Sequence, residues 1–147
     1  MKIGKHFTLE ELTKTKSGLP NKPNLTEQQA LSELVKTILD PLRDMYDHPI
    51  NVNSGYRSKA VNIAANKGKV LPSQHCRGEA ADIDTEKDNG LLFRLIRDNF
   101  TFDQLIWEGG DDLNPAWVHV SYRADGKNRK QKLRMKVIKG KKKYLPL

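Results

Sequence analysis

Two of the four histidines stand where they could take part in chemistry. His75 precedes Asp82 by seven positions, and His119 lies in an apolar segment further along the chain. A catalytic zinc ion needs three protein ligands drawn from His, Asp or Glu, and one open position. His75, Asp82 and His119 could supply these ligands, although their spacing alone is a weak signal. The other two, His6 and His48, lie beside helix ends or turns, and we expect them to face solvent.

Strand alternation strengthens this interpretation, because side chains at every second position of a strand share a face. Asp82, Glu108 and His119 fall one in each of three short predicted strands. These strands cover residues 80–84, 104–108 and 117–122. Asp82 stands among small and apolar residues, where a carboxylate needs a partner or a metal. If the last two strands pair across the glycine-rich loop between them, Glu108 lies near His119.

A carboxylate beside a metal site is what metal-assisted hydrolysis needs as its general base. Glu108 is our first candidate for this base, and a solvated strand end is its alternative interpretation. Asp111 and Asp112, in the loop that follows, are the fallback candidates.

The order of these residues resembles the zinc-binding signature of the D-alanyl-D-alanine carboxypeptidase-like metallopeptidases. The matching motifs are Ser73-x-His75-x-x-Gly78-x-Ala80-Ala81-Asp82 and Trp117-x-His119-x-Ser121. Upstream, the turn at 53–58 resembles the arginine turn of that family. The segments 7–12 and 39–43 resemble its phage- and prophage-associated branch. The resemblance covers most of the chain, and five motifs in the same order are far more specific than any one of them.

The resemblance implies a zinc ion held by His75, Asp82 and His119, with water in the fourth position. It also implies that Arg57 binds the substrate, with Ser73 close to the same substrate group. Some relatives carry an acid three residues before the last histidine ligand, where this chain has an alanine. That version of the base is therefore absent, and Glu108 takes its place in our prediction.

The elements that must position these residues indicate an α+β fold. Helices are predicted mostly in the first half and antiparallel strands mostly in the second. We expect a small antiparallel sheet that carries the zinc site and packs against N-terminal helices, in the manner of the Hedgehog/DD-peptidase-like fold that the resemblance implies. A long helix over 26–46 contains Pro41, which should kink or reset it. The other predicted helices begin near Thr8 with a capping box to Glu11, and span residues 59–66 and 90–100.

The net charge of +8 belongs to one segment. Residues 127–147 contain ten Lys and Arg and no acid, whereas residues 1–126 hold the other 16 basic and all 18 acidic residues, a net charge of −2. We predict a catalytic domain over 1–126, and a basic segment over 127–147 that adds an edge strand and a tail outside the proposed site. No helix-turn-helix or aromatic-lined basic groove accompanies this segment, so we expect no nucleic-acid partner. It could instead attract anionic wall polymers.

These features together predict a zinc peptidase that hydrolyses stem or cross-link peptides of bacterial peptidoglycan, as an endolysin does. The alternatives are a D-Ala-D-Ala carboxypeptidase acting on a free C-terminus, and a non-catalytic zinc module that binds the wall or belongs to a phage particle. No signal peptide or transmembrane segment is visible, so we expect a monomer made in the cytoplasm that reaches the wall after release or as a virion component. The single cysteine, Cys76, excludes an intrachain disulfide.

Overall fold

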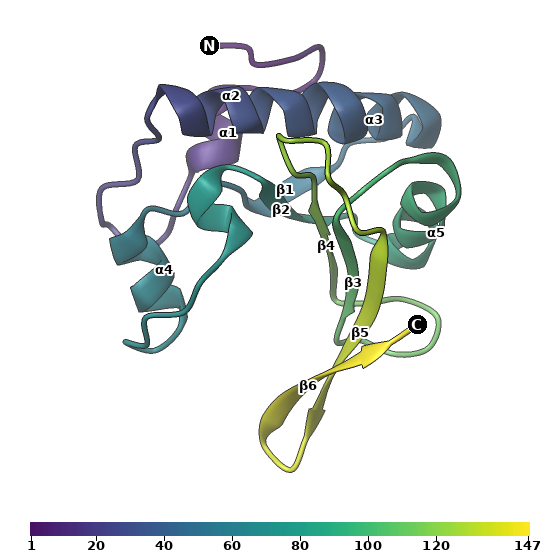
Figure 1. Cartoon of the computed structure of the whole chain (residues 1–147). Coiled ribbons are helices and arrows are strands. Elements are labelled where there is room, and N and C mark those ends of the chain that lie inside the picture. Colours follow the sequence, from purple (N-terminus) through teal and green to yellow (C-terminus); the bar gives the residue numbers. More distant parts are fainter.

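Six strands form one sheet, in the order β1-β2-β4-β3-β5-β6. The structure, a computed structural model, describes residues 1–147 (Figure 1). The strands are β1 (Asn51–Ser54), β2 (Ala80–Asp84), β3 (Gln104–Glu108), β4 (Trp117–Ser121), β5 (Gln131–Ile138) and β6 (Lys141–Pro146). The predicted α+β fold, with a sheet beside N-terminal helices, is confirmed.

Four of the helical segments (α1, α2, α4 and η2) begin at a side chain that accepts a hydrogen bond from a backbone N–H at the start of the segment. The segments are α1 (Leu9–Thr13), α2 (Leu25–Leu34), η1 (Val35–Leu39), α3 (Asp40–Tyr46), α4 (Lys59–Ala65), η2 (Gln74–Arg77) and α5 (Asn89–Asn99). The predicted capping box of Thr8 and Glu11 starts α1, and Asn24 and Glu27 form a second one at α2. Such boxes satisfy backbone N–H groups that have no partner inside the helix.

Pro41 resets the long predicted helix without breaking it. Residues 35–39 widen into a π-helical turn, in which the Asp40 N–H bonds to the Val35 carbonyl, and α3 then continues to Tyr46. Proline has no N–H to donate and its ring would clash with the carbonyl four residues earlier. The wider turn before Pro41 accommodates both constraints.

Alternation along the strands separates a core face from an open face. Ala81, Ile83, Leu105, Val118 and Val120 are fully buried against the helices. The α2–η1–α3 layer and α5 supply the helical side of this core, with buried side chains Leu31, Leu34, Val35, Ile38, Leu39, Leu42, Leu92, Phe93 and Ile96. The intervening residues of β2, β3 and β4 therefore point to the opposite face, where the candidate site lies.

The basic C-terminal segment differs from its prediction, because it forms two strands instead of one edge strand and a tail. β5 pairs with β3, and β6 pairs with β5 as the new edge. The β3–β5 pair is parallel, so the sheet is not antiparallel throughout. The reason is geometric: β4 ends where β3 begins, and the short connection over 122–130 starts β5 at that same end. β5 joins the same sheet as β3, and the domain division at residue 126 stays a prediction.

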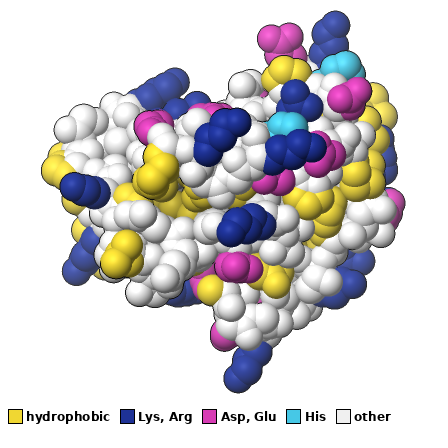
Figure 2. All heavy atoms as spheres, turned by 90° about the horizontal axis from the view of Figure 1, so that it is seen from above, with side chains coloured by type: hydrophobic (Ala, Val, Ile, Leu, Met, Phe, Trp, Pro, Cys, Tyr) yellow, Lys and Arg dark blue, Asp and Glu magenta, His cyan; other side chains and the backbone are white.

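The helical layer presents mixed charges to solvent. Seen from above, acidic and basic side chains are interspersed on this face (Figure 2). This agrees with the near-neutral charge of residues 1–126. None of the helices has the length and hydrophobicity that crossing a bilayer would require.

Candidate metal centre and active-site cleft

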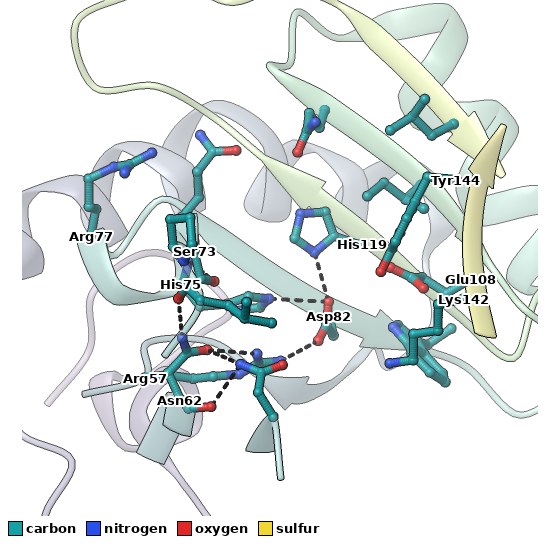
Figure 3. Close-up of a pocket in the computed structure, with 18 of the residues that line it drawn as sticks. Arg57, Asn62, Ser73, His75, Arg77, Asp82, Glu108, His119, Lys142 and Tyr144 are labelled. Atoms are coloured by element: carbon teal, nitrogen blue, oxygen red, sulfur yellow. Dashed lines mark hydrogen bonds and ion pairs between the residues drawn. The ribbon is translucent and has the colours of Figure 1, made fainter. Parts of the chain in front are cut away.

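A cleft of about 670 Å³ lies on the open face of the sheet. All six residues predicted for the site line it, namely Arg57, Ser73, His75, Asp82, Glu108 and His119 (Figure 3). They come from η2, the turn after β1, and strands β2, β3 and β4. Segments far apart in the sequence therefore meet in one cleft.

Asp82 and His119 are held together by strand pairing. They are directly opposite each other in the antiparallel pair β2–β4, and His119 Nδ1 lies 3.0 Å from Asp82 Oδ1. His75 Nε2 approaches the same carboxylate oxygen at 3.5 Å from η2. One donor atom from each of the three buried residues lies within 4.8 Å of the others.

This donor set fits a zinc ion. Ligand atoms at about 2.0–2.1 Å from a tetrahedral metal are roughly 3.3 Å from one another. The separations of 3.0 and 3.5 Å from Asp82 Oδ1 to the two imidazoles are close to this value. Two imidazoles with one carboxylate also form a ligand set known from catalytic zinc sites.

His75 is oriented by its own surroundings. Its Nδ1 lies 2.7 Å from the Gly55 carbonyl, to which it donates, and Nε2 is thereby left as the acceptor that faces Asp82. Metal-ligating histidines generally make such a second hydrogen bond. Ser73 Oγ accepts from the His75 N–H at 3.1 Å and caps η2. Gly78 ends η2 with a φ of 74°, against the Glu27 carbonyl, where a side chain would clash.

The charges in the site support one another. Burial opposes the ionisation of Asp82, but the charges and hydrogen bonds of His75 and His119 outweigh it and hold the pKa of Asp82 far below its usual range. Burial lowers the pKa of His75, which favours the neutral imidazole. A deprotonated carboxylate and a neutral imidazole are the forms that bind metals.

Arg57 lies beside the ligand group, by which we mean His75, Asp82 and His119, and three side chains hold it in place. Its Nε donates to Ser54 Oγ at 2.8 Å, Nη1 to Asn62 Oδ1 at 3.4 Å and Nη2 to Asp82 Oδ2 at 3.1 Å. A guanidinium has five N–H donors, so two remain available to a bound molecule. Asn62, which with Val61 belongs to the segment that resembles the family's arginine turn, is buried and also donates to the Leu71 carbonyl.

Glu108 is a buried carboxylate that accepts no hydrogen bond from the chain and is only 7% exposed. Burial raises its pKa to about 7, helped by the charge of Asp82 and opposed by that of His119. The fallback candidates lie elsewhere. Asp111 accepts hydrogen bonds from two backbone N–H groups of its own loop, and Asp112 is exposed and paired with Arg134 at 2.7 Å. Neither aspartate lines the cleft.

The prediction that the basic segment lies outside the site is wrong. Lys142 and Tyr144 of β6 line the cleft, on the side of Asp82 and His119 away from Arg57 (Figure 3). Residues that pair across neighbouring strands share a face of the sheet. Glu108 pairs with Met135 and Met135 pairs with Tyr144, so Tyr144 lies on the same open face as Glu108. Alternation within the segment places Lys142 and Tyr144 on the same face of their strand. It could not show that β5 pairs with β3, which brings that face into the cleft.

A buried His–Asp–His group in a cleft, next to an unpartnered carboxylate, is the arrangement of a metal-dependent hydrolase on an α+β fold. Residues 5–121 match the Peptidase M15 family, and the chain belongs to that family. It is therefore a zinc metallopeptidase, of a family that acts on peptidoglycan-type substrates. A comparison with curated proteins gave no match.

Proposed function

We propose that this protein hydrolyses peptide bonds in the stem or cross-link peptides of bacterial peptidoglycan and acts as an endolysin-like endopeptidase at the cell wall. One observation carries the proposal: three converging donor groups and the unpartnered Glu108 share a cleft that is open to solvent. The similarity of the N-terminal motifs to phage and prophage members supports the endolysin role.

In this proposal His75 Nε2, Asp82 Oδ1 and His119 Nδ1 hold the zinc ion. When bound, zinc supplies Lewis acidity toward a carbonyl and makes a water molecule more acidic. The Gly55 carbonyl keeps the His75 ring in its binding tautomer. Arg57 orients the Asp82 carboxylate through its second oxygen.

Glu108 is the proposed general base. Its carboxylate lines the cleft beside the three ligand residues and accepts no hydrogen bond from the chain, so it is free to take a proton from the attacking water and return it to the leaving amine. The strand register supports this role, since Glu108 lies diagonally across the β3–β4 pair from His119 and on the same face.

Arg57 is the proposed substrate-binding residue, together with Ser73. The two unused N–H groups of Arg57 can donate to a carbonyl or a carboxylate of the peptide. Ser73 Oγ accepts from the His75 N–H and lines the cleft, which leaves its hydroxyl hydrogen for the same substrate group.

The test is hydrolysis of purified peptidoglycan by the zinc-loaded and the chelator-treated protein, with mass spectrometry of the released muropeptides. We expect zinc-dependent cleavage within stem or cross-link peptides. Release of terminal D-alanine alone would identify a carboxypeptidase instead of an endopeptidase. Stoichiometric zinc binding without any turnover would identify a non-catalytic wall-binding module and overturn the proposal.

We further propose that lysines near the tip of the β5–β6 hairpin bind anionic wall polymers. Lys136, Lys139 and Lys141 are exposed there, and none of them forms an ion pair within the chain. Such attraction is weakened by salt, because mobile ions screen exposed charges. Association with purified walls should therefore decrease as the ionic strength rises.

A further inference from the structure

The β5–β6 hairpin lies beyond the residues that match the peptidase family, which end at residue 121. Nevertheless β6 forms one wall of the cleft (Figure 3). Tyr144 shares the open face with Glu108 through Met135. Lys142, two residues earlier on the same strand, faces the same way. An element additional to the family match thus reaches the candidate active site.

Lys142 differs from the other cations of the cleft, which are all ion-paired. Arg57 pairs with Asp82 at 3.1 Å, Arg77 with Glu79 at 3.0 Å and Arg129 with Asp103 at 2.7 Å. Lys142 lines the same cleft and has no carboxylate within ion-pair distance. It is therefore the one lysine or arginine of the cleft that forms no ion pair, although its charge acts on Glu108 and opposes the rise in the pKa of that carboxyl.

The surroundings of Lys142 favour a singly charged, extended partner. Glu108 stands in the same cleft without an ion pair, and its negative charge repels a multiply charged anion more strongly than a single carboxylate. Tyr144 has a pKa raised by burial and by the charges of Glu108 and Asp82, so its phenol stays neutral and can pack against a peptide chain. A carboxylate on a largely neutral peptide matches these conditions.

We propose that Lys142 is a specificity-determining residue that binds a carboxylate of the substrate peptide, on the wall of the cleft opposite Arg57. This inference rests on the proposed peptidase function and adds the part of the substrate that β6 recognises. The peptide is then held from two sides, by Arg57 near the ligand group and by Lys142 at the hairpin.

The experiment pairs enzyme variants with modified substrates. A stem-peptide substrate is prepared together with derivatives in which each carboxylate is replaced in turn by a carboxamide. Wild type, Lys142→Gln, Lys142→Arg and Lys143→Gln are compared by kcat and KM. Lys143 is the matched control, because it is the next residue of β6 and faces away from the cleft.

We expect one amidation to raise the wild-type KM by roughly five- to tenfold, as befits a partly exposed charge-assisted contact, with little change in kcat. The same amidation should have no effect in Lys142→Gln, whereas Lys142→Arg should restore discrimination and Lys143→Gln should behave as wild type. If the wild type hydrolyses the peptides but no effect of amidation on KM depends on Lys142, this inference is overturned and the proposed function is not. Absence of zinc-dependent hydrolysis of every peptide would overturn the proposed function itself.

Discussion

Glu108 combines burial with the lack of any hydrogen-bond partner, a combination that costs stability and is typical of groups at functional sites. The other carboxylates near the site are all engaged: Asp82 by Arg57 and the two histidines, and Asp103 by Arg129. This combination is why we propose Glu108 as the general base of the site.

The proposed role of Glu108 makes the rate of hydrolysis depend on its carboxylate. Glu108→Gln should lower kcat/KM by about 10²- to 10⁴-fold, the usual contribution of a general base. The zinc content should stay at one ion per chain, because Glu108 is not among the three ligand residues. Asp112→Asn, at the exposed fallback position, is the matched control and should keep the wild-type rate. Full activity of Glu108→Gln with bound zinc would place the base elsewhere.

The ionisation of Glu108 also affects the stability of the metal-free protein. Burial raises the Glu108 pKa from 4.5 to about 7, so the folded state favours its protonated form. Ionising the buried Glu108 destabilises the folded protein. This destabilisation is absent below the pKa of the unfolded chain, grows as the pH rises from 4.5 through 7 and is complete above pH 7. Because one pKa unit corresponds to about 1.4 kcal/mol, Glu108→Gln should stabilise the protein by up to about 3 kcal/mol near pH 8 and by almost nothing near pH 4.5.

Urea unfolding of chelator-treated wild type and Glu108→Gln at both pH values measures this difference. Asp112→Asn serves again as the control, and we expect no pH-dependent difference from wild type there. A stability difference of the same size at both pH values would show that the substitution acts through packing and not through ionisation.

At the scale of elements, the β5–β6 hairpin has two surfaces with different partners. Its open face carries Lys142 and Tyr144 into the cleft. Its tip projects from the rest of the fold (Figure 1), and Lys139 and Lys141 are exposed there. The segment that holds the positive charge of the chain is thus also a wall of the site.

Deletion of residues 141–147 should therefore reduce both wall association and the hydrolysis of a small soluble peptide. The loss removes two cleft residues, opens Glu108 to water and exposes the edge of β5. Lys139→Gln combined with Lys141→Gln should weaken only the association with walls at low salt. If the deletion leaves soluble-peptide hydrolysis intact, β6 has no part in the site. Sedimentation with purified walls and a peptide assay, run on both variants, separate the two effects.

At the scale of the whole molecule, the ligand group joins parts of the chain that are distant in sequence. η2, β2 and β4 each supply one ligand, and the turn after β1 holds both Arg57 and the carbonyl that orients His75. A metal that binds only the folded arrangement stabilises it by mass action, by about 4 kcal/mol when its concentration exceeds Kd a thousandfold.

Removal of zinc should consequently lower the melting temperature by about 10 °C, given the few degrees per kcal/mol expected for a chain of this length. His119→Ala should melt at the same temperature with and without chelator, because the ligand group is then incomplete. Scanning calorimetry with and without zinc tests this. An unchanged melting temperature of the wild type on chelation would exclude a zinc site that is coupled to folding.

Six of the residues that line the cleft were predictable from the sequence by itself. Alternation places Asp82 and His119 on defined faces of their strands, and the ordered motifs around them resemble the signature of a known peptidase family, whereas the spacing of the ligands alone was a weak signal. The capping box at Thr8 and the helix containing Pro41 are local features as well, and both were predicted for the same reason.

The surroundings of those residues depend on contacts between distant parts of the chain. The Gly55 contact that orients His75 joins residues 20 positions apart, and the burial of Glu108 depends on strands that pair across the sheet. The place of Lys142 follows from the parallel pairing of β5 with β3, which no local pattern in residues 127–147 encodes. Alternation sets the face of a side chain within its own strand, whereas the neighbouring strand is chosen by long-range packing and connection geometry.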